Sequence, residues 1–256
     1  MEAVTIGIPV LQNIVNAMDH IAPFSTAEDW DNVGLLVGDS NREISKVLLT
    51  LDITNEVIKE AKEKGCELII SHHPVIFNPI TSLNTKHPVY NLAKNNIYAL
   101  CLHTNLDKAE NGVNITLAET LNLQDLQKYD DNLFIIGELE KEMNSEEFAS
   151  FIKDKLKLGG IKYTKGKNIK SVAVSCGGAG DEVFRLENHE FDAFVTGDMK
   201  HHEFLYAKSH NISAYEAGHY NTEHIIVPKL KELLSDQFPD IEFLISETDC
   251  DPNKYL

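Results

Sequence analysis

The chain has 256 residues, of which 43% are hydrophobic and 25% charged, so it can form one large or two small domains with substantial cores. Its 40 acidic residues outnumber its 23 lysines and arginines. The resulting formal net charge of −17 argues against nonspecific binding to DNA or to an anionic membrane, whose phosphates would repel it.

Nothing in the sequence indicates export or membrane insertion. No apolar stretch approaches membrane-spanning length, and the N-terminus lacks the positively charged segment of a signal peptide. The four cysteines are scattered, without the spacing of disulfides or of a thiolate metal site. We therefore expect a cytoplasmic protein with reduced thiols and no membrane partner.

The first half of the chain alternates helical and strand patterns. Apolar residues recur at helical spacing over residues 8–21. Short apolar runs typical of buried strands follow at 33–37, 47–51, 68–71 and 97–102, and helical patterns lie at 55–64, 89–94 and 113–121. This alternation predicts a mostly parallel sheet that is covered by helices.

The second half repeats the alternation after a polar stretch at residues 124–131. Strands are expected at 133–139, 171–176, 193–196 and 212–215, helices at 145–156, 181–187 and 201–209, and a tail with helix 221–234 and strand 242–246. We predict two α/β domains with mostly parallel or mixed sheets and a metal-binding cleft between them. The first comprises residues 1–125 completed by the tail 218–256, and the second comprises residues 126–217.

Histidines and carboxylates follow apolar runs in three separate segments. Ligands of α/β proteins bind where strands end at their carboxyl edge, and Pro74 keeps the histidines before it on a stiff turn. The segments are SHHP with His72 and His73, HTNLD with His103 and Asp107, and GHYNTE with His219 and Glu223.

Imidazole and carboxylate donors of this kind suit Zn, Mn, Fe or Ni. His219 and Glu223 are four residues apart and would share one face of a helix. Any one of these residues alone is more often a surface or hydrogen-bonding residue, and Glu223 could merely stabilise a helix's first turn. Five or six ligands together exceed the needs of one tetrahedral ion and predict two ions about 3.5–4 Å apart, bridged by a carboxylate.

The motifs SHHPVIF, HTNLD, EDWDNVGLLVG and YEAGHYNTE resemble those of the Ngg-interacting factor three-like family of dinuclear metal proteins, often labelled GTP cyclohydrolase I type 2 homologs. The resemblance covers nearly the whole chain, which is too short for the inserted domain of the family's long form. It implies that the metal ligands are His72, His73, Asp107, His219 and Glu223, with His103 as a ligand or an orienting partner. It also implies a homohexameric toroid whose metal sites face an inner cavity.

Two further features have both simple and functional interpretations. Gly177, Gly178 and Gly180 in CGGAGD could cradle a phosphate, but a tight turn is the simpler interpretation, because the GxGxxG spacing and the lysine of a P-loop are missing. His201 and His202 open a predicted helix, where a surface pair is the simpler interpretation and a proton shuttle the functional one.

Residues of the early loop and of the first strand–helix connection are expected to be structural. Trp30 is predicted to anchor the core or an interface rather than to stack on a substrate. Helix capping accounts for Asp52 and Thr54. Glu28 or Asp29 could act as a base if the loop folds over the metals.

Two carboxylate-bridged ions activate water and bind an electrophilic oxygen, which favours hydrolysis of a phosphoester, an amide-like C–N bond or a purine ring carbon. His103, His202 or Glu28 could transfer protons. A metal-dependent hydrolase acting on a nucleotide or related small molecule is the leading hypothesis. A non-catalytic metal-binding or metal-handling protein and an oligomeric interaction protein are the alternatives, since the sequence specifies no substrate pocket.

Overall fold

The computed structural model describes residues 9–129, 132–188 and 190–256. The chain divides into two compact units, the first formed by Met1–Leu106 and Val227–Cys250 and the second by Asp107–Ile226 and Asp251–Leu256. Both are α/β with mixed sheets, which confirms the predicted fold class. The boundary predicted at residue 125 falls inside a strand of the second unit, because the polar stretch there is an exposed edge strand rather than a linker.

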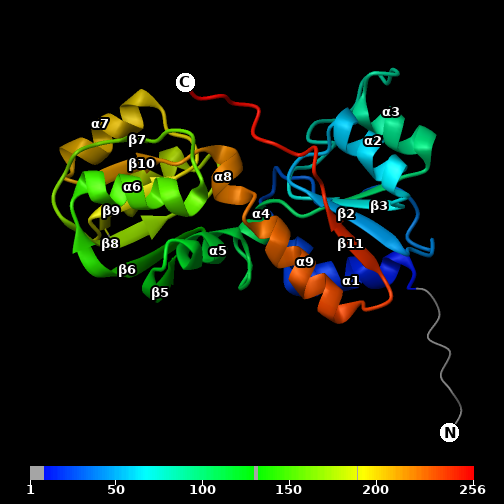
Figure 1. Ribbon diagram of the computed structural model, residues 1–256, viewed down its shortest axis with the longest axis horizontal. Coiled ribbons are helices and arrows are strands. Elements are labelled where there is room, and N and C mark those ends of the chain that lie inside the picture. The colour runs from blue at the N-terminus through cyan, green and yellow to red at the C-terminus, as the bar shows by residue number, and fades with distance from the viewer. Residues whose placement is uncertain (1–8, 130–131, 189) are drawn as a thin grey trace, which may run out of the picture. The chain divides into compact units, whose positions relative to one another are not determined.

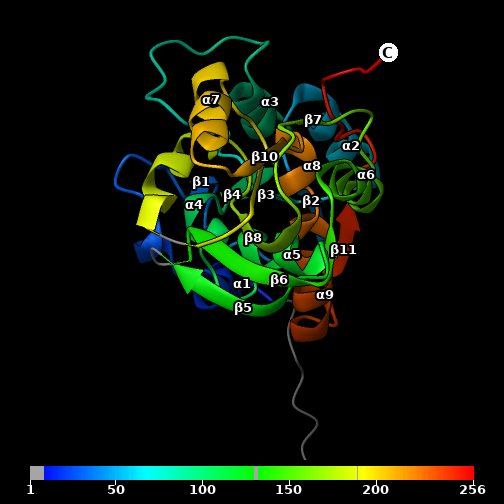
Figure 2. The same cartoon turned by 90° about the vertical axis from the view of Figure 1, so that its left-hand side faces the viewer.

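The first unit contains a five-stranded sheet with the order β1-β4-β3-β2-β11, and Figure 2 shows these strands side by side. All neighbours are parallel except β1, which is antiparallel to β4. The elements are α1 (Leu11–Ile21), the 3-10 turn η1 (Phe24–Thr26), β1 (Gly34–Val37), β2 (Lys46–Thr50), α2 (Asn55–Lys64), β3 (Leu68–Ser71), α3 (Pro88–Asn95), β4 (Tyr98–Cys101), α9 (Ile226–Gln237) and β11 (Glu242–Ile245).

Helices cover both faces of this sheet, with α2 and α3 on one face and α1 and α9 on the other (Figure 1). Val57 of α2 and Leu92 of α3 belong to one buried cluster with Leu48, Ile69 and Ala99 of the strands. Because side chains of a strand alternate between faces, a sheet covered on both sides needs consecutive apolar residues. That requirement explains why β2 and β3 were recognisable in the sequence as uninterrupted apolar runs.

The ends of α2 follow the local rules for helix capping. The Thr54 hydroxyl accepts a hydrogen bond from the Val57 N–H at 3.2 Å, as predicted for a capping residue. Gly65 ends the helix in the left-handed conformation, with φ at 73°, where glycine carries no steric penalty. The capping prediction is therefore confirmed for Thr54.

The second unit contains a six-stranded sheet with the order β5-β6-β8-β9-β10-β7, in which β8, β9 and β10 are parallel and the other pairings are antiparallel. Its elements are α4 (Thr104–Asp107), which begins within the first unit, α5 (Val113–Thr120), β5 (Gln124–Tyr129), β6 (Phe134–Met143), α6 (Ser145–Leu156), β7 (Lys162–Tyr163), β8 (Ile169–Val174), the 3-10 helix η2 (Gly180–Asn188), β9 (Ala193–Thr196), α7 (His201–Ser209), β10 (Ser213–Glu216) and α8 (His219–Glu223).

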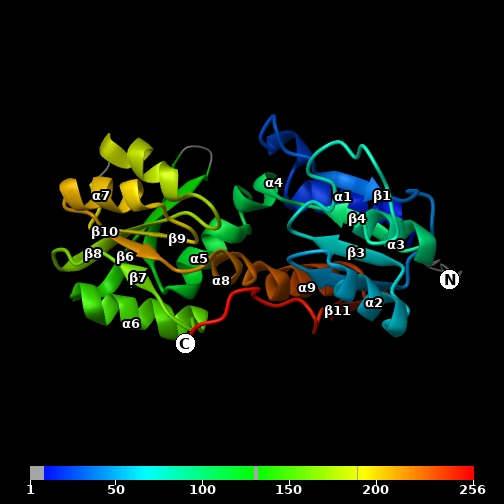
Figure 3. The same ribbon diagram turned by 90° about the horizontal axis from the view of Figure 1, so that it is seen from above.

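Helices α6 and α7 lie on opposite sides of this sheet (Figure 3). On the α7 side, Ala207 packs in a buried cluster with Phe194 and other strand residues. On the α6 side, the Phe148 ring meets Tyr215 edge-on at 5.0 Å, and the Tyr215 hydroxyl donates to the Ser145 carbonyl at 3.1 Å. The parallel core of β8, β9 and β10 is thus covered on both faces.

Several details differ from the sequence predictions. The helix expected over 221–234 is two helices, α8 and α9, separated by a turn, and the segment 181–187 is a 3-10 helix. Trp30 is 60% exposed on a surface loop, so its predicted role as a core anchor is wrong, whereas the interface alternative stays a prediction. In the part of the chain that the structure describes, no helix is both long and apolar enough to cross a membrane.

Candidate metal centre

Three histidines gather at the carboxyl edge of the first unit's sheet. β2, β3 and β4 are parallel there, and the last residue of each pairs with the last residue of its neighbour. His72 and His73 follow β3 directly, and His103 follows β4 after one residue. One ligand atom of each ring lies within 4.8 Å of one ligand atom of each of the other two. This geometry fits a group of metal ligands.

Each of the three rings is oriented through its Nδ1 atom. A carbonyl or carboxylate oxygen can only accept a hydrogen bond, so Nδ1 carries the proton and the lone pair of the neutral ring lies on Nε2. Metal-binding histidines usually have this arrangement. The pairs are His72 with the Leu102 carbonyl at 2.9 Å, His73 with Asp52 at 2.8 Å and His103 with Asp31 at 2.9 Å.

Asp31 is the buried anchor of His103. Its side chain has no exposed surface and also accepts hydrogen bonds from the Thr104 N–H and hydroxyl and from the Asn32 N–H. Burial alone would raise the pKa of Asp31, but the hydrogen bonds from His103 and Thr104 outweigh it and hold that pKa well below its usual range. Asp31 therefore stays a carboxylate and holds the ring in place.

The carboxyl edge of the second unit's sheet is built from glycine turns. The Asp198 N–H donates to the Gly177 carbonyl at 2.9 Å, and the Gly218 N–H donates to the Gly197 carbonyl at 3.0 Å, so strand pairing continues into the loops. A Cβ atom on Gly197 would lie 2.4 Å from the Gly177 oxygen and 2.9 Å from the His219 Cα. Glycine is required at position 197 because any side chain would push the loops apart.

His219 lies between two carboxylates of the second unit. Its Nδ1 is 2.7 Å from Asp198 Oδ2, and its Nε2 is 3.1 Å from Oε2 of the buried Glu223, one turn along α8 as the spacing predicted. The hydrogen bonds to Asp198 and then to Glu223 raise the pKa of His219 to about 10. Without a metal the ring is therefore an imidazolium that neutralises the carboxylates beside it.

Cys176 is a neighbour of Asp107 that sequence spacing could not reveal, because the two residues are 69 positions apart. The thiol donates to Asp107 Oδ1 at 3.2 Å and is buried. Burial, reinforced by the charges of Asp107 and Glu223, raises the pKa of Cys176 well above its ordinary value. The thiol thus keeps its proton and acts as a hydrogen-bond donor to the carboxylate.

Of the three glycines of CGGAGD, Gly177 and Gly180 lie against carboxylates. The Gly177 N–H donates to the Thr222 hydroxyl at 3.1 Å, and a Cβ on Gly177 would lie 1.9 Å from Glu223 Oε1. A Cβ on Gly180 would lie 2.3 Å from Oε2 of the buried Glu203. The close approach of these carboxylates to the backbone thus explains why positions 177 and 180 are glycines. A phosphate-binding role of this loop stays a prediction.

The remaining predicted residues do not belong to either cluster of side chains just described. His201 and His202 are exposed at the start of α7, where the His202 ring stacks on Phe184 at 6.0 Å. Glu28 is half-buried, and its N–H donates to the Thr104 hydroxyl at 3.0 Å. Proton transfer by His202 or Glu28 stays a prediction.

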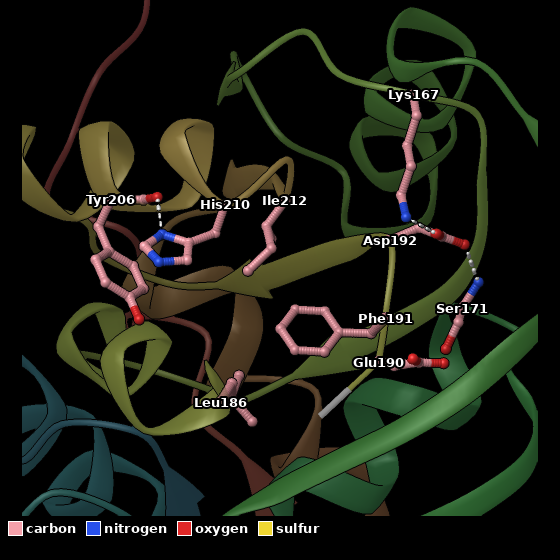
Figure 4. A pocket seen from close by; sticks show the side chains of 9 residues that line it. All are labelled: Lys167, Ser171, Leu186, Glu190, Phe191, Asp192, Tyr206, His210 and Ile212. Atoms are coloured by element: carbon pink, nitrogen blue, oxygen red, sulfur yellow. Dashed lines mark hydrogen bonds and ion pairs between the residues drawn. The ribbon is translucent and has the colours of Figure 1, made fainter. Parts of the chain in front are cut away.

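The second unit has cavities at both edges of its parallel strands. A cavity of about 590 Å³ lies at the amino ends of β9 and β10, where Phe191 and Tyr206 line one part and Asp192 another (Figure 4). A cavity of about 380 Å³ at the carboxyl edge includes Gly178 and Asp198, the partner of His219. Only the second of these two cavities adjoins the candidate metal ligands of its unit.

Comparisons with known proteins cover nearly the whole chain. The model of a family described as Duf34/NIF3 (NGG1p interacting factor 3) matches residues 9–252. A GTP cyclohydrolase 1 type 2 homolog of Clostridium perfringens is 35% identical over 260 residues, covering 96% of this chain and 99% of that protein. The crystal structure of a Staphylococcus aureus hypothetical protein has a TM-score of 0.91 at 31% identity, covering 96% of this chain and 99% of that one. A Bacillus cereus protein related to NIF3, at 21% identity and a TM-score of 0.92, shares the fold over 97% of this chain and 99% of its own.

Proposed function

The chain belongs to the Duf34/NIF3 family, and from that premise we propose that it binds two divalent metal ions and uses them to hydrolyse a nucleotide or a related small molecule. The proposed ligands are His72, His73 and His103 of the first unit and Asp107, His219 and Glu223 of the second. The observation that carries the proposal is the group of three imidazoles whose Nδ1 atoms are each held by an acceptor.

The two sets of donors complement each other chemically. The first unit supplies imidazoles, which carry no charge when they bind a metal, whereas two divalent ions also need anionic ligands, which Asp107 and Glu223 of the second unit supply. Buried carboxylates are costly unless a cation accompanies them, and the imidazolium of His219 is such a cation. Metal binding to His219 would release its proton to solvent, and the ion would take over the positive charge. When bound, such ions act as Lewis acids and activate water near neutral pH.

A nucleotide substrate is supported by the name of the Clostridium perfringens relative, a GTP cyclohydrolase 1 type 2 homolog. A name carries less weight than the ligands, because one fold supports many reactions. We assign proton transfer to His202 or Glu28, since His103 serves as a ligand in this proposal. The metals are first-row divalent ions, with Zn, Fe, Mn and Ni all matching the donor types.

Elemental analysis tests the proposal on protein purified without immobilised nickel. We expect about two ions per chain, and we expect His72→Ala and Glu223→Ala to lose them while circular dichroism shows an intact fold. His20→Ala, which removes an exposed histidine of α1, is the matched control. Absence of metal from the parent protein, even after reconstitution, would contradict the proposal.

Turnover separates the hydrolase from a metal-binding protein without catalysis. A hydrolase should release product from a panel of nucleotides and lose that activity on chelation and in Asp107→Asn. Tight metal uptake with strong thermal stabilisation but no turnover would instead identify a protein that stores or transfers metal.

We also propose a cytoplasmic location and a homohexamer. All four cysteines are free thiols, which suits a reducing compartment. The hexamer is carried over from the family resemblance, and sedimentation velocity of the purified chain would test it. A monomer at micromolar concentration would contradict it.

A further inference from the structure

Two large aromatic side chains of the first unit are exposed beside the candidate ligand His103. Trp30 is 60% and Phe77 49% exposed, and their ring centroids are 5.8 Å apart at a tilt of 52°. Each ring also meets the His103 ring nearly edge-on, at 6.1 Å for Trp30 and 6.3 Å for Phe77. Rings of this size are usually buried, so a pair left in solvent beside a candidate centre indicates a surface that is covered by something else.

Hydrogen bonds hold the backbone beside both rings. The neighbour of Trp30, Asp31, is held by its bonds from His103 and Thr104, and Asn32 donates through its side chain to the Ile76 carbonyl at 2.5 Å. That bond links the Trp30 loop to the residue before Phe77. The two rings are therefore presented by well-anchored loops and do not owe their exposure to loose chain segments.

We propose that Trp30 and Phe77 form a stacking surface for a planar heteroaromatic ring of the substrate, whose reacting part lies at the histidines. This inference rests on the proposed function and adds the chemical class of the substrate and the residues that select it. Stacking recognises any flat π-system, so it suits a base or a related fused ring and not a sugar phosphate alone. Contact of both rings with His103 places the stacking surface at the rim of the metal ligands.

A titration with two matched probes tests this proposal. Trp30 is the chain's single tryptophan, so its fluorescence reports on this surface alone. Zinc-loaded protein is titrated with adenosine 5′-monophosphate and with ribose 5-phosphate, which has the same phosphate and sugar but no heteroaromatic base. We expect the nucleotide to quench the fluorescence and, by calorimetry, to bind about tenfold or more tightly than the sugar phosphate.

The variants separate stacking from other roles. Trp30→Ala and Phe77→Ala should each weaken nucleotide binding by about tenfold and leave ribose 5-phosphate binding unchanged, and Trp30→Phe should retain most of the affinity. Phe184→Ala removes a partly exposed ring of the second unit and serves as the matched control.

Three results would overturn the proposal. Equal affinity of the two probes would do so, as would absence of nucleotide binding to zinc-loaded protein. Dissociation of the assembly by Trp30→Ala with unchanged nucleotide affinity would assign the rings to a protein interface instead. Zinc content is measured on the same samples, so a failure of the metal proposal appears as a metal-free parent protein and is distinguished from a failure of stacking.

Discussion

The carboxyl edges of the two sheets hold their candidate ligands in opposite ways. In the first unit, each of three imidazoles has its own acceptor, and the two carboxylates among these acceptors, Asp31 and Asp52, bind different rings. In the second unit, the single imidazole of His219 lies between the carboxylates of Asp198 and Glu223. The carboxyl edge of the first unit, the first edge, therefore holds each ring with a separate acceptor, whereas that of the second unit, the second edge, places one ring between two carboxylates.

This difference sets how each edge responds to a metal and to mutation. The imidazolium of His219 must release a proton before its ring can bind a metal. The first edge depends on side-chain anchors such as Asp31. The second depends on glycines that let loops and carboxylates approach closely. Substitutions of these anchors and of these glycines test the comparison.

Gly177→Ala should have the largest effect on stability because it disrupts the close packing of the second edge. Its Cβ would lie 1.9 Å from Glu223 Oε1, and its φ of 59° is in the left-handed region. Crowding and backbone strain together should lower the free energy of unfolding by about 4 kcal/mol. Urea denaturation measures this change.

Gly65→Ala is the matched control for Gly177→Ala. Gly65 has a similar φ of 73°, but no atom lies within 4 Å of its added Cβ. Gly65→Ala should therefore lower the free energy of unfolding by about 1–2 kcal/mol, from strain in the left-handed backbone conformation alone. Equal losses in the two variants would show that crowding against Glu223 is unimportant.

Acid should weaken the first unit through the buried Glu60 of α2. Its carboxylate accepts hydrogen bonds from Lys64 and from the segment after β11, where Ser246, Glu247 and Thr248 all donate to it. Burial opposes ionisation, but these hydrogen bonds, led by that from Lys64, lower the pKa of Glu60 from 4.5 to about 2. The carboxylate therefore fixes the end of β11 only while it is ionised.

The pH dependence follows from the sign of that shift. Since the folded pKa lies below the unfolded one, the stabilisation is fully present above about pH 4.5 and is lost as the pH falls through about 2. We expect Glu60→Gln to cost about 3 kcal/mol at neutral pH and to flatten this part of the stability profile. Glu63→Gln, an exposed residue of the same helix, is the control. An unchanged profile in Glu60→Gln would contradict the assignment.

Asp31→Asn tests the side-chain anchors of the first edge. The amide keeps the size of the buried side chain but removes the charge that orients His103, so metal affinity should fall by about 10- to 100-fold. Asp52→Asn should have a smaller effect because Asp52 is partly exposed and contacts His73 through one oxygen. Competition with a chromogenic chelator measures the metal affinity of both variants. A larger loss in Asp52→Asn than in Asp31→Asn would contradict this account.

The fold and the clusters of candidate ligands were predictable because their signals are local. Uninterrupted apolar runs mark parallel strands. His72 and His73 directly follow β3 in the chain, and His103 follows β4 after one residue. The spacing of His219 and Glu223 likewise fixed their shared helix face.

The supporting residues were not predictable because their partners are distant in the chain. Asp31 meets His103 across 72 residues, and Asp52 meets His73 across 21. In sequence, a turn or a helix cap accounts for both aspartates equally well. Helix α8 was merged with α9 because the turn between them contains neither glycine nor proline.

Cys176→Ala should have the smallest effect on metal affinity. It tests whether a side-chain anchor also holds a ligand at the second edge. Losing the thiol donor to Asp107 should weaken metal binding by about three- to tenfold, since a thiol is a weak donor and its hydrogen bond contributes only about 1 kcal/mol. Cys176→Ser, which keeps a donor, should stay closer to the parent, and Cys66→Ala, a buried thiol of the first unit, should not alter metal affinity. A sulfur-to-cobalt absorption band in the Co²⁺ protein that Cys176→Ala abolishes would show instead that the sulfur is itself a ligand. The second edge would then differ from the first in its donor atoms as well as in its charges.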